Sequence, residues 1–325
     1  MLTPQNYKTL LLNAFLCCSG VLFFAACQSD DPDSPADKPY LVYSYNIQDA
    51  PVYEGFKQAQ NQGLIQNTLI DEASGLAVSR SNPNYIWTHN DKGDINRLFV
   101  LDHNAQDLGY YRIDGAINRD WEDICIGPGP DSLIMYLYVG DIGDNDAVYP
   151  SIMIYRFPEP DLTLLTAPTI GVVPQALVQT LICLYPDGPK DAEALMIDPL
   201  TRDLYIITKR GEHSLMYKAP FPQSTQSPIL LQKVAQFPFN RVLASDISAR
   251  GDEILVKTDE RILYWKRNHN ESVEQALSRM PYSIPYTLEP QGEAIGWAPN
   301  AQGFYTLSEW VQPIQPPLYY YERKP

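Results

Sequence analysis

Five stretches of the chain repeat one pattern, in which a polar or acidic residue leads through a small residue or an aspartate into an apolar run. They begin at Glu72, Asp120, Asp191, Ala244 and Gln291. A turn, a second apolar run and a third follow each stretch, and four of the five repeats also contain a fourth. Four short strands in every ~50 residues are the signature of a β-propeller. We therefore predict an all-β fold, a β-propeller of five four-stranded blades; the competing β-sandwich does not explain the recurrent polar start.

The repeats also predict where the ring is irregular. The second repeat is long, and we expect an insertion at residues 158–174. The fifth repeat ends at the C-terminus without a fourth strand, so we expect residues 64–70 to supply one and close the ring, which removes a free sheet edge. Residues 40–47 would add either an edge strand or part of a sixth blade. Helix is expected only at residues 53–62 and 271–280.

The composition suits a folded chain of short strands and turns. Apolar residues make up 45% and charged residues 19%, so the chain can bury a core. Its 28 prolines and 22 tyrosines fit strands and turns better than a helical bundle. The formal net charge of -15 argues against a nucleic-acid partner, because phosphate binding needs a basic surface. We expect a monomer with a small-molecule or glycan ligand whose identity the sequence leaves open.

The N-terminus has the pattern of an export signal. Lys8 precedes an apolar run that ends at residues 25–27 (AAC), and a basic residue before such a run is typical of a secretory signal. Small residues before a cysteine resemble the bacterial lipobox, in which the cysteine, here Cys27, is diacylated and becomes the mature N-terminus. Residues 28–31 (QSDD) resemble the acidic export signal of Bacteroidota surface lipoproteins. The alternative is an uncleaved anchor helix.

This pattern predicts three parts of the chain. Residues 1–26 would be the signal peptide, residues 27–38 a disordered acidic tether, and residues 39–325 a single propeller domain. Lipid would then hold the exported protein at the bacterial outer membrane. Besides Cys27, the mature chain keeps only Cys125 and Cys183. Because the repeats place these two in non-adjacent strands of one blade, we expect two buried free thiols.

In a propeller the first strand of each blade lines the central channel, so acids at its start converge on one channel mouth. The candidate metal ligands there are Glu72, Asp120, Glu122, Asp191, Glu193, Asp246 and Glu293. Carboxylates crowded together repel each other unless a cation lies among them, and oxygen-only ligands favour Ca²⁺ or Mg²⁺ over zinc. The alternative is structural: the acids cap backbone N–H groups or pair with Lys209 and Lys257.

The second strands end near the same mouth. They bring His89, Asn90, Asp91, Asp141, Asp144, Asn145, Lys209, Lys257 and Glu309. Residues 141–146 (DIGDND) are acidic but do not match an EF-hand loop, so a hydrogen-bonded turn is the alternative to a metal loop. The four histidines lack zinc-site spacing, and no Gly-x-Ser-x-Gly elbow supports a serine nucleophile.

Several of these motifs resemble a known group of proteins. They are residues 72–77 (EASGLA), 87–91 (WTHND), 120–124 (DWEDI), 140–145 (GDIGDN) and 185–195 (YPDGPKDAEAL). They resemble uncharacterised bacterial β-propeller lipoproteins over about residues 70–310. The chain is also more weakly similar to phytase-like and gluconolactonase-like propellers, which implies a channel Ca²⁺ and hydrolysis of phosphoesters or lactones by metal-activated water. It lacks the dense lysines and arginines of a phytate-binding cleft.

Two classes of function follow. One is a Ca²⁺-dependent hydrolase whose site lies at the channel mouth, with His89 or Asp91 as the candidate base. The other is a non-catalytic surface propeller that binds a glycan or a partner protein through exposed aromatic and acidic residues, among them Trp87, Trp121, Trp297 and Trp310. Fold alone does not choose between them.

Overall fold

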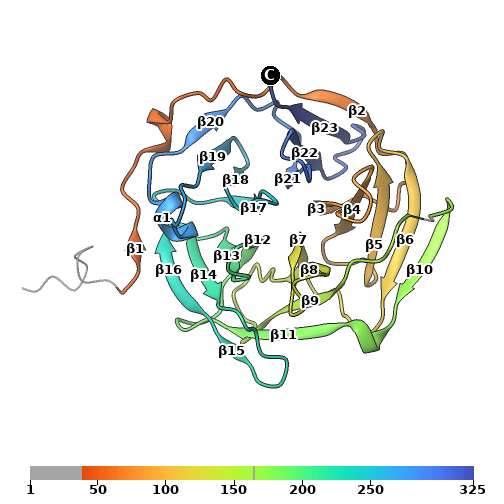
Figure 1. The fold of residues 1–325 in the computed structure, drawn as a ribbon, viewed down its shortest axis with the longest axis horizontal. Helices are drawn as coiled ribbons and strands as arrows, with labels where there is room; N and C mark the ends of the chain where they lie inside the picture. Colours follow the sequence, from red (N-terminus) through yellow and green to blue (C-terminus); the bar gives the residue numbers. More distant parts are fainter. Residues whose placement is uncertain (1–38, 164) are drawn as a thin grey trace, which may run out of the picture. The chain divides into compact units, whose positions relative to one another are not determined.

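The protein forms five β-sheets that follow one another around a central axis (Figure 1). The computed structural model describes residues 39–163 and 165–325, so the expected signal peptide, Cys27 and the tether lie outside the described residues. Lys38–Pro325 form one compact unit. The predicted five-bladed propeller is confirmed.

Each blade has four strands in antiparallel order from the axis outward. The first blade contains β3 (Ala73–Val78), β4 (Tyr85–Asn90), β5 (Arg97–Asp102) and β6 (Asp107–Ile113). The second contains β7 (Trp121–Pro128), β8 (Met135–Asp141), β9 (Ile152–Pro158) and β11 (Gln179–Leu184). The third contains β12 (Ala192–Ile197), β13 (Leu204–Thr208), β14 (Leu215–Ala219) and β16 (Gln232–Gln236). The fourth contains β17 (Val242–Ile247), β18 (Glu253–Thr258), β19 (Ile262–Lys266) and β20 (Tyr282–Ile284).

The fifth blade closes the ring. It combines β21 (Gly292–Trp297), β22 (Gly303–Ser308) and β23 (Pro317–Glu322) with β2 (Gln60–Leu64) from the other end of the chain. Closure by an N-terminal strand is therefore confirmed, but its position at residues 64–70 was wrong. Ile65 and Ile70 instead enter the core below this strand. Because β2 pairs with β23, the last blade has no unpaired edge there.

The N-terminal segment runs around the outside of three blades (Figure 1). β1 (Leu41–Val42) pairs with β16 of the third blade, Val52 bridges to Ser283 of the fourth, and β2 completes the fifth. Residues 40–47 thus supply an edge strand and no sixth blade. The helix expected at residues 53–62 was wrong, because this stretch is an extended strap against the sheet edges.

Two further strands cross between neighbouring blades. β10 (Thr169–Val173) lies within the predicted insertion and pairs in parallel with β6 of the preceding blade. β15 (Ile229–Leu230), from the third blade, pairs in the same way with β11 of the second. The insertion at residues 158–174 is thus an exchange strand that fastens two blades together.

The core lies between the blades. Each pair of adjacent blades encloses its own cluster of buried apolar side chains, which makes five clusters around the ring. β3, β12, β17 and β21 are buried along their whole length, because both faces of each inner strand pack against a neighbour. This explains why the inner strands are apolar runs without polar alternation. All these elements lie within residues 39–325.

Helix is scarce among the described residues. α1 (Val273–Leu277) lies within the predicted segment 271–280 and begins with a capping box between Ser272 and Gln275. No helix of the described part is long and apolar enough to cross a membrane. Cys125 in β7 and Cys183 in β11 are buried free thiols with two strands between them, as predicted.

Candidate metal centre

Every inner strand carries a β-bulge at the same place, one residue after its first ladder pair. The bulged residues are Ser74, Glu122, Glu193, Leu243 and Glu293. A bulge inserts one unpaired residue and redirects its side chain. Three of the five positions are therefore glutamates at one level of the ring.

A second polar level lies two residues before the bulges. It comprises Glu72, Asp120, Asp191, Arg241 and Gln291. Glu72 thus matches Asp120 rather than Glu122, and Asp246 lies three residues beyond its own bulge at Leu243. The sequence pattern aligned these acids in one row, but the bulges distribute them over different levels.

The structure brings three of the predicted ligands together. Carboxylate oxygens of Glu122, Asp191 and Glu193 all lie within 4.8 Å of one another, and all three residues are buried. They come from adjacent inner strands, with Glu122 in β7 and Glu193 in β12, and Asp191 directly before β12. A set of carboxylate oxygens suits a hard divalent cation such as Ca²⁺ or Mg²⁺. This group could hold a metal ion.

Asp120 lies beside the three acids. A Cβ atom at Gly143 would lie 2.2 Å from Oε1 of Glu122 and 2.7 Å from Oδ2 of Asp120, so only glycine leaves space for both carboxylates. Oδ1 of Asp120 is buried without a hydrogen-bond partner among the described residues, and Lys92 lies 3.7 Å from it. Unsatisfied buried oxygens of this kind fit a cation.

Basic side chains partly neutralise the acids. Nζ of Lys209 lies 2.7 Å from Oε1 of Glu193, and Arg210 Nε donates to Asp191 at 2.5 Å. The other Asp191 oxygen accepts the backbone N–H of Asp144 at 2.9 Å. Ser74 donates to Glu122 at 3.3 Å. The predicted structural roles of these acids, capping and pairing with Lys209, are thus present alongside the metal-compatible geometry.

The burial of several acids changes their protonation. Burial and the charges of Glu193, Asp120 and Glu293 raise the pKa of Glu122 well above its usual value. Burial raises the pKa of Glu193 to about 7, although Lys209 opposes this rise. Burial also raises the pKa of Asp120, against the effect of Lys92. The centre therefore disfavours three full negative charges unless a cation lies among them.

Two carboxyl pairs lie at the mouth beside this centre. Burial and a hydrogen bond with Glu72 raise the pKa of Asp91 to about 9. Burial, the charge of Glu293 and a hydrogen bond with it raise the pKa of Glu309 to about 8. Each of these two carboxyl groups thus lies against a second acid at the mouth, Glu72 or Glu293.

The loop after β8 is a hydrogen-bonded turn. Asp141 accepts the backbone N–H of Asp120 at 2.9 Å, and Asp144 accepts that of Tyr149 at 2.7 Å. Asn145, which is exposed, accepts from Arg210. The loop thus supports the candidate centre through Asp120 and Arg210.

His89, Asn90 and Lys257 are placed away from the three central acids. The ring of His89 is fully buried at 5.7 Å from Trp121, and its Nδ1 lies 3.0 Å from the carbonyl of Asn90. Burial lowers the pKa of His89 to about 4. Asn90 donates to the carbonyl of Leu69, and the fully buried Lys257 donates to the carbonyl of Gly292.

Asp246 stabilises the fold by linking two inner strands. It accepts the N–H groups of Ile247 at 2.8 Å and Trp297 at 2.7 Å, which links β17 to β21. Asp123, which the sequence analysis did not single out, links three inner strands in the same way: it accepts from Ile124 in β7 and from Leu195 in β12. Its third donor is Ser245 in β17.

A pocket of about 380 Å³ adjoins the centre on the side of the fourth and fifth blades. Lys209 and Glu293 line this pocket, and Lys209 also pairs with Glu193 of the centre. Arg241 and Gln291 line the pocket as well. Ser74, Gly143 and Arg241 are site residues that the sequence analysis missed, because their alignment with the acids depends on the bulges.

In sequence comparisons the chain matches no protein-family model and no curated protein.

Proposed function

We propose that this propeller is a hydrolase of phosphoesters that depends on a divalent cation, Ca²⁺ in the first instance. The observation that carries the proposal is the convergence of Glu122, Asp191 and Glu193 within 4.8 Å of one another. When bound, the cation would stabilise negative charge that develops on the substrate and lower the pKa of a water ligand. Asp120 would add a fourth carboxylate at the open side of the group.

Basic residues around the acids favour an anionic substrate. Lys92, Arg210 and Arg241 are exposed at the mouth, and Lys209 reaches from the centre into the adjoining pocket. Each of the three exposed residues already lies beside an acid, namely Asp120, Asp191 and Asp259, but their remaining donors match the oxygen acceptors of a phosphate group better than those of a neutral lactone. The geometry therefore supports phosphoesters over lactones.

Glu309 is the best-placed proton donor. Its pKa of about 8 keeps it protonated at neutral pH, and it contacts Glu293 and Gln291, which line the pocket. A neutral carboxylic acid can donate its proton to a leaving alkoxide. Asp91, whose pKa is raised to about 9, is likewise protonated at neutral pH, so it would act as a second acid and not as the base expected from the sequence. His89, enclosed by the core, is the weaker of the predicted candidates.

Export would give the centre its cation. We infer from residues 25–27 that the mature protein is anchored through Cys27 at the outer membrane. Extracellular modules bind Ca²⁺ with dissociation constants of about 10⁻⁴–10⁻³ M, so a partly neutralised site suffices there.

The test is hydrolysis of para-nitrophenyl phosphate by residues 39–325 stripped with EDTA and then supplied with Ca²⁺ or Mg²⁺. We expect release of nitrophenol only with the cation, and its loss in the double variant Glu122→Gln and Glu193→Gln. Asp131→Asn, in an exposed loop, is the matched control. Ca²⁺ binding without hydrolysis of this or other phosphoesters would favour the non-catalytic binding protein. The burial of Trp87, Trp121 and Trp297 already removes most of the aromatic contacts expected for that alternative.

A further inference from the structure

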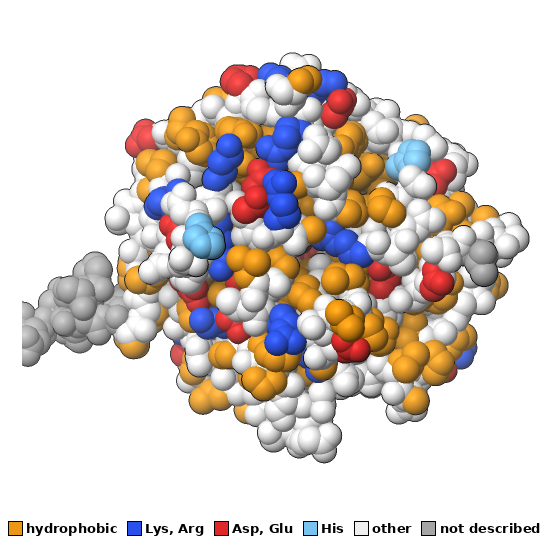
Figure 2. All heavy atoms as spheres, in the orientation of Figure 1, with side chains coloured by type: hydrophobic (Ala, Val, Ile, Leu, Met, Phe, Trp, Pro, Cys, Tyr) orange, Lys and Arg blue, Asp and Glu red, His pale blue; other side chains and the backbone are white. Residues whose placement is uncertain are grey.

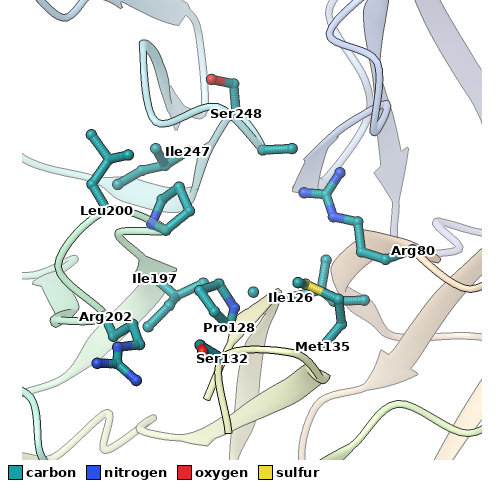
Figure 3. A pocket seen from close by; sticks show the side chains of 13 residues that line it. Arg80, Ile126, Pro128, Ser132, Met135, Ile197, Leu200, Arg202, Ile247 and Ser248 are labelled. Atoms are coloured by element: carbon teal, nitrogen blue, oxygen red, sulfur yellow. The ribbon is translucent and has the colours of Figure 1, made fainter. Parts of the chain in front are cut away.

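A second and larger pocket lies at the opposite mouth of the channel. Its volume is about 680 Å³, and it lies where β7, β12 and β17 end (Figure 3). The candidate metal centre uses the beginnings of these same inner strands. The pocket is therefore separate from that centre, and the inference below does not rest on the proposed function.

The walls of this pocket are apolar and polar in nearly equal parts. They include Ile126, Pro128, Met135, Ile197, Leu200 and Ile247. Leu200 is 64% exposed, and Leu133 in the neighbouring loop is 90% exposed. On the face that Figure 2 shows, hydrophobic side chains lie next to Lys and Arg side chains. A cavity of this size and lining is typical of sites for small organic molecules.

Arg80 brings a positive charge to the pocket, where Asp246 and Glu159 favour that charge without forming an ion pair with it. Among the described residues its guanidinium group has no hydrogen-bond or ion-pair partner, and its Nη1 is buried. Burial lowers the pKa of this group, yet an arginine keeps its proton in proteins. A buried, unpaired cation is costly, which indicates a site for an anion.

The neighbouring acids are already occupied. Glu159 accepts the backbone N–H groups of Arg80 and Ser81 and the indole N–H of Trp87. Asp246 accepts two backbone N–H groups, as described above. Neither acid forms an ion pair with the Arg80 side chain, so its donors are available to a ligand.

Arg202 adds a second positive charge on the opposite side of the pocket (Figure 3). Its guanidinium group stacks on Phe221 at 3.8 Å and donates to the carbonyl of Gly129 at 3.3 Å. It has no acidic partner among the described residues. Both arginines thus line the cavity, and neither forms an ion pair with an acid of the described residues.

We propose that this pocket binds a small organic carboxylate with an apolar body. The carboxylate accepts hydrogen bonds from Arg80, and the body packs on Ile126, Ile197 and Ile247. Arg202 attracts the anion from the rim. The apolar body distinguishes this ligand from an inorganic anion, and the charge distinguishes it from a neutral hydrophobic compound.

Titration calorimetry of residues 39–325 with three probes tests this inference. We expect naphthylacetate to bind in preference to naphthylethanol, which lacks the charge, and to acetate, which lacks the body. Arg80→Gln should weaken naphthylacetate binding about tenfold or more. The matched control is Arg112→Gln, which removes an exposed arginine on β6 away from the pocket and should leave binding unchanged.

A second variant covers the case in which Arg80→Gln fails to fold. Leu200→Glu places a negative charge at the exposed rim and should weaken naphthylacetate binding more than naphthylethanol binding. No binding of naphthylacetate, equal binding of naphthylacetate and naphthylethanol, or unchanged binding in a folded Arg80→Gln protein would overturn the proposal.

Discussion

The ammonium group of Lys209 lies 2.7 Å from Oε1 of Glu193 and 3.7 Å from Oε1 of Glu293. It therefore joins two bulge residues from non-adjacent blades. Burial lowers the pKa of Lys209, but Glu193 and Glu293 more than offset this, so its pKa is raised and it stays charged. Lys209 is thus an internal counter-ion of the acidic centre and a competitor for any divalent cation.

Lys209→Met should tighten Ca²⁺ binding. Removal of one positive charge close to the site lessens its repulsion of the incoming ion, and we expect about a tenfold lower dissociation constant. The same variant should be less stable in EDTA, because Glu193 loses its partner. Titration calorimetry gives the affinity, and Lys57→Met, from an exposed ion pair with Glu322, is the control. Equal Ca²⁺ affinity in both variants and the wild type would refute the competition.

The stability of the cation-free protein should fall as pH rises. The pKa values of Asp91, Glu193 and Glu309 are raised to about 9, 7 and 8, from ordinary values near 4. Between about pH 4 and 9 the folded protein therefore binds more protons than the unfolded chain, and its free energy of unfolding decreases with pH. Melting curves recorded in EDTA from pH 5 to 9 measure this decrease in stability.

Ca²⁺ should flatten that dependence, because it favours the ionised carboxylates. The rise in melting temperature on adding Ca²⁺ should then be larger at pH 8 than at pH 5.5. A Ca²⁺ effect that is independent of pH would show that these carboxyl groups do not participate.

Asp123→Ala should destabilise the ring strongly. Asp123 accepts backbone N–H groups from β7, β12 and β17, and its loss leaves buried donors unpaired. Each costs about 1–3 kcal/mol, so we expect about 3 kcal/mol or more in urea unfolding. Asp131→Ala, which loses one bond in an exposed loop, should cost less than about 1 kcal/mol. Similar losses in the two variants would contradict this role for Asp123.

Cys27→Ala should abolish lipid labelling and membrane association of the full chain. The reason is that the lipobox cysteine is the only residue to which the diacyl group can be attached. Metabolic labelling with a fatty acid, followed by membrane fractionation, measures both. Labelling that persists in the variant would refute Cys27 as the lipidated residue, whereas membrane association without labelling would support an uncleaved anchor.

The sequence was sufficient for the fold but only for part of the site. Repeated apolar runs predict blades because the inner strand of each blade must bury both faces. Glu122 and Glu193 were predicted as candidate ligands because they occupy matching places in adjacent repeats, and Asp191 because it matches Asp120. The levels of Glu72 and Asp246 in the ring were not predicted, because a β-bulge shifts the strand register by one residue without a sequence signature of its own.

The bounds of strands that pair with distant parts of the chain also could not be predicted from the sequence. β10 pairs with a strand from the preceding blade, and β2 pairs with the C-terminal strand, so local pattern gave no boundary for either. The tryptophans were expected at the surface as contacts of a binding protein, but Trp87, Trp121 and Trp297 fill the space between blades.

The most direct test of the metal centre is a Ca²⁺ titration of EDTA-stripped residues 39–325 by calorimetry. We predict one ion per molecule for the wild type and no detectable binding for the Glu122→Gln and Glu193→Gln double variant. That variant should fold and melt in EDTA at or above the wild-type temperature, because the repulsion between the two carboxylates is gone. A wild-type protein that takes up no Ca²⁺ or Mg²⁺, and melts identically with and without them, would contradict the proposed centre.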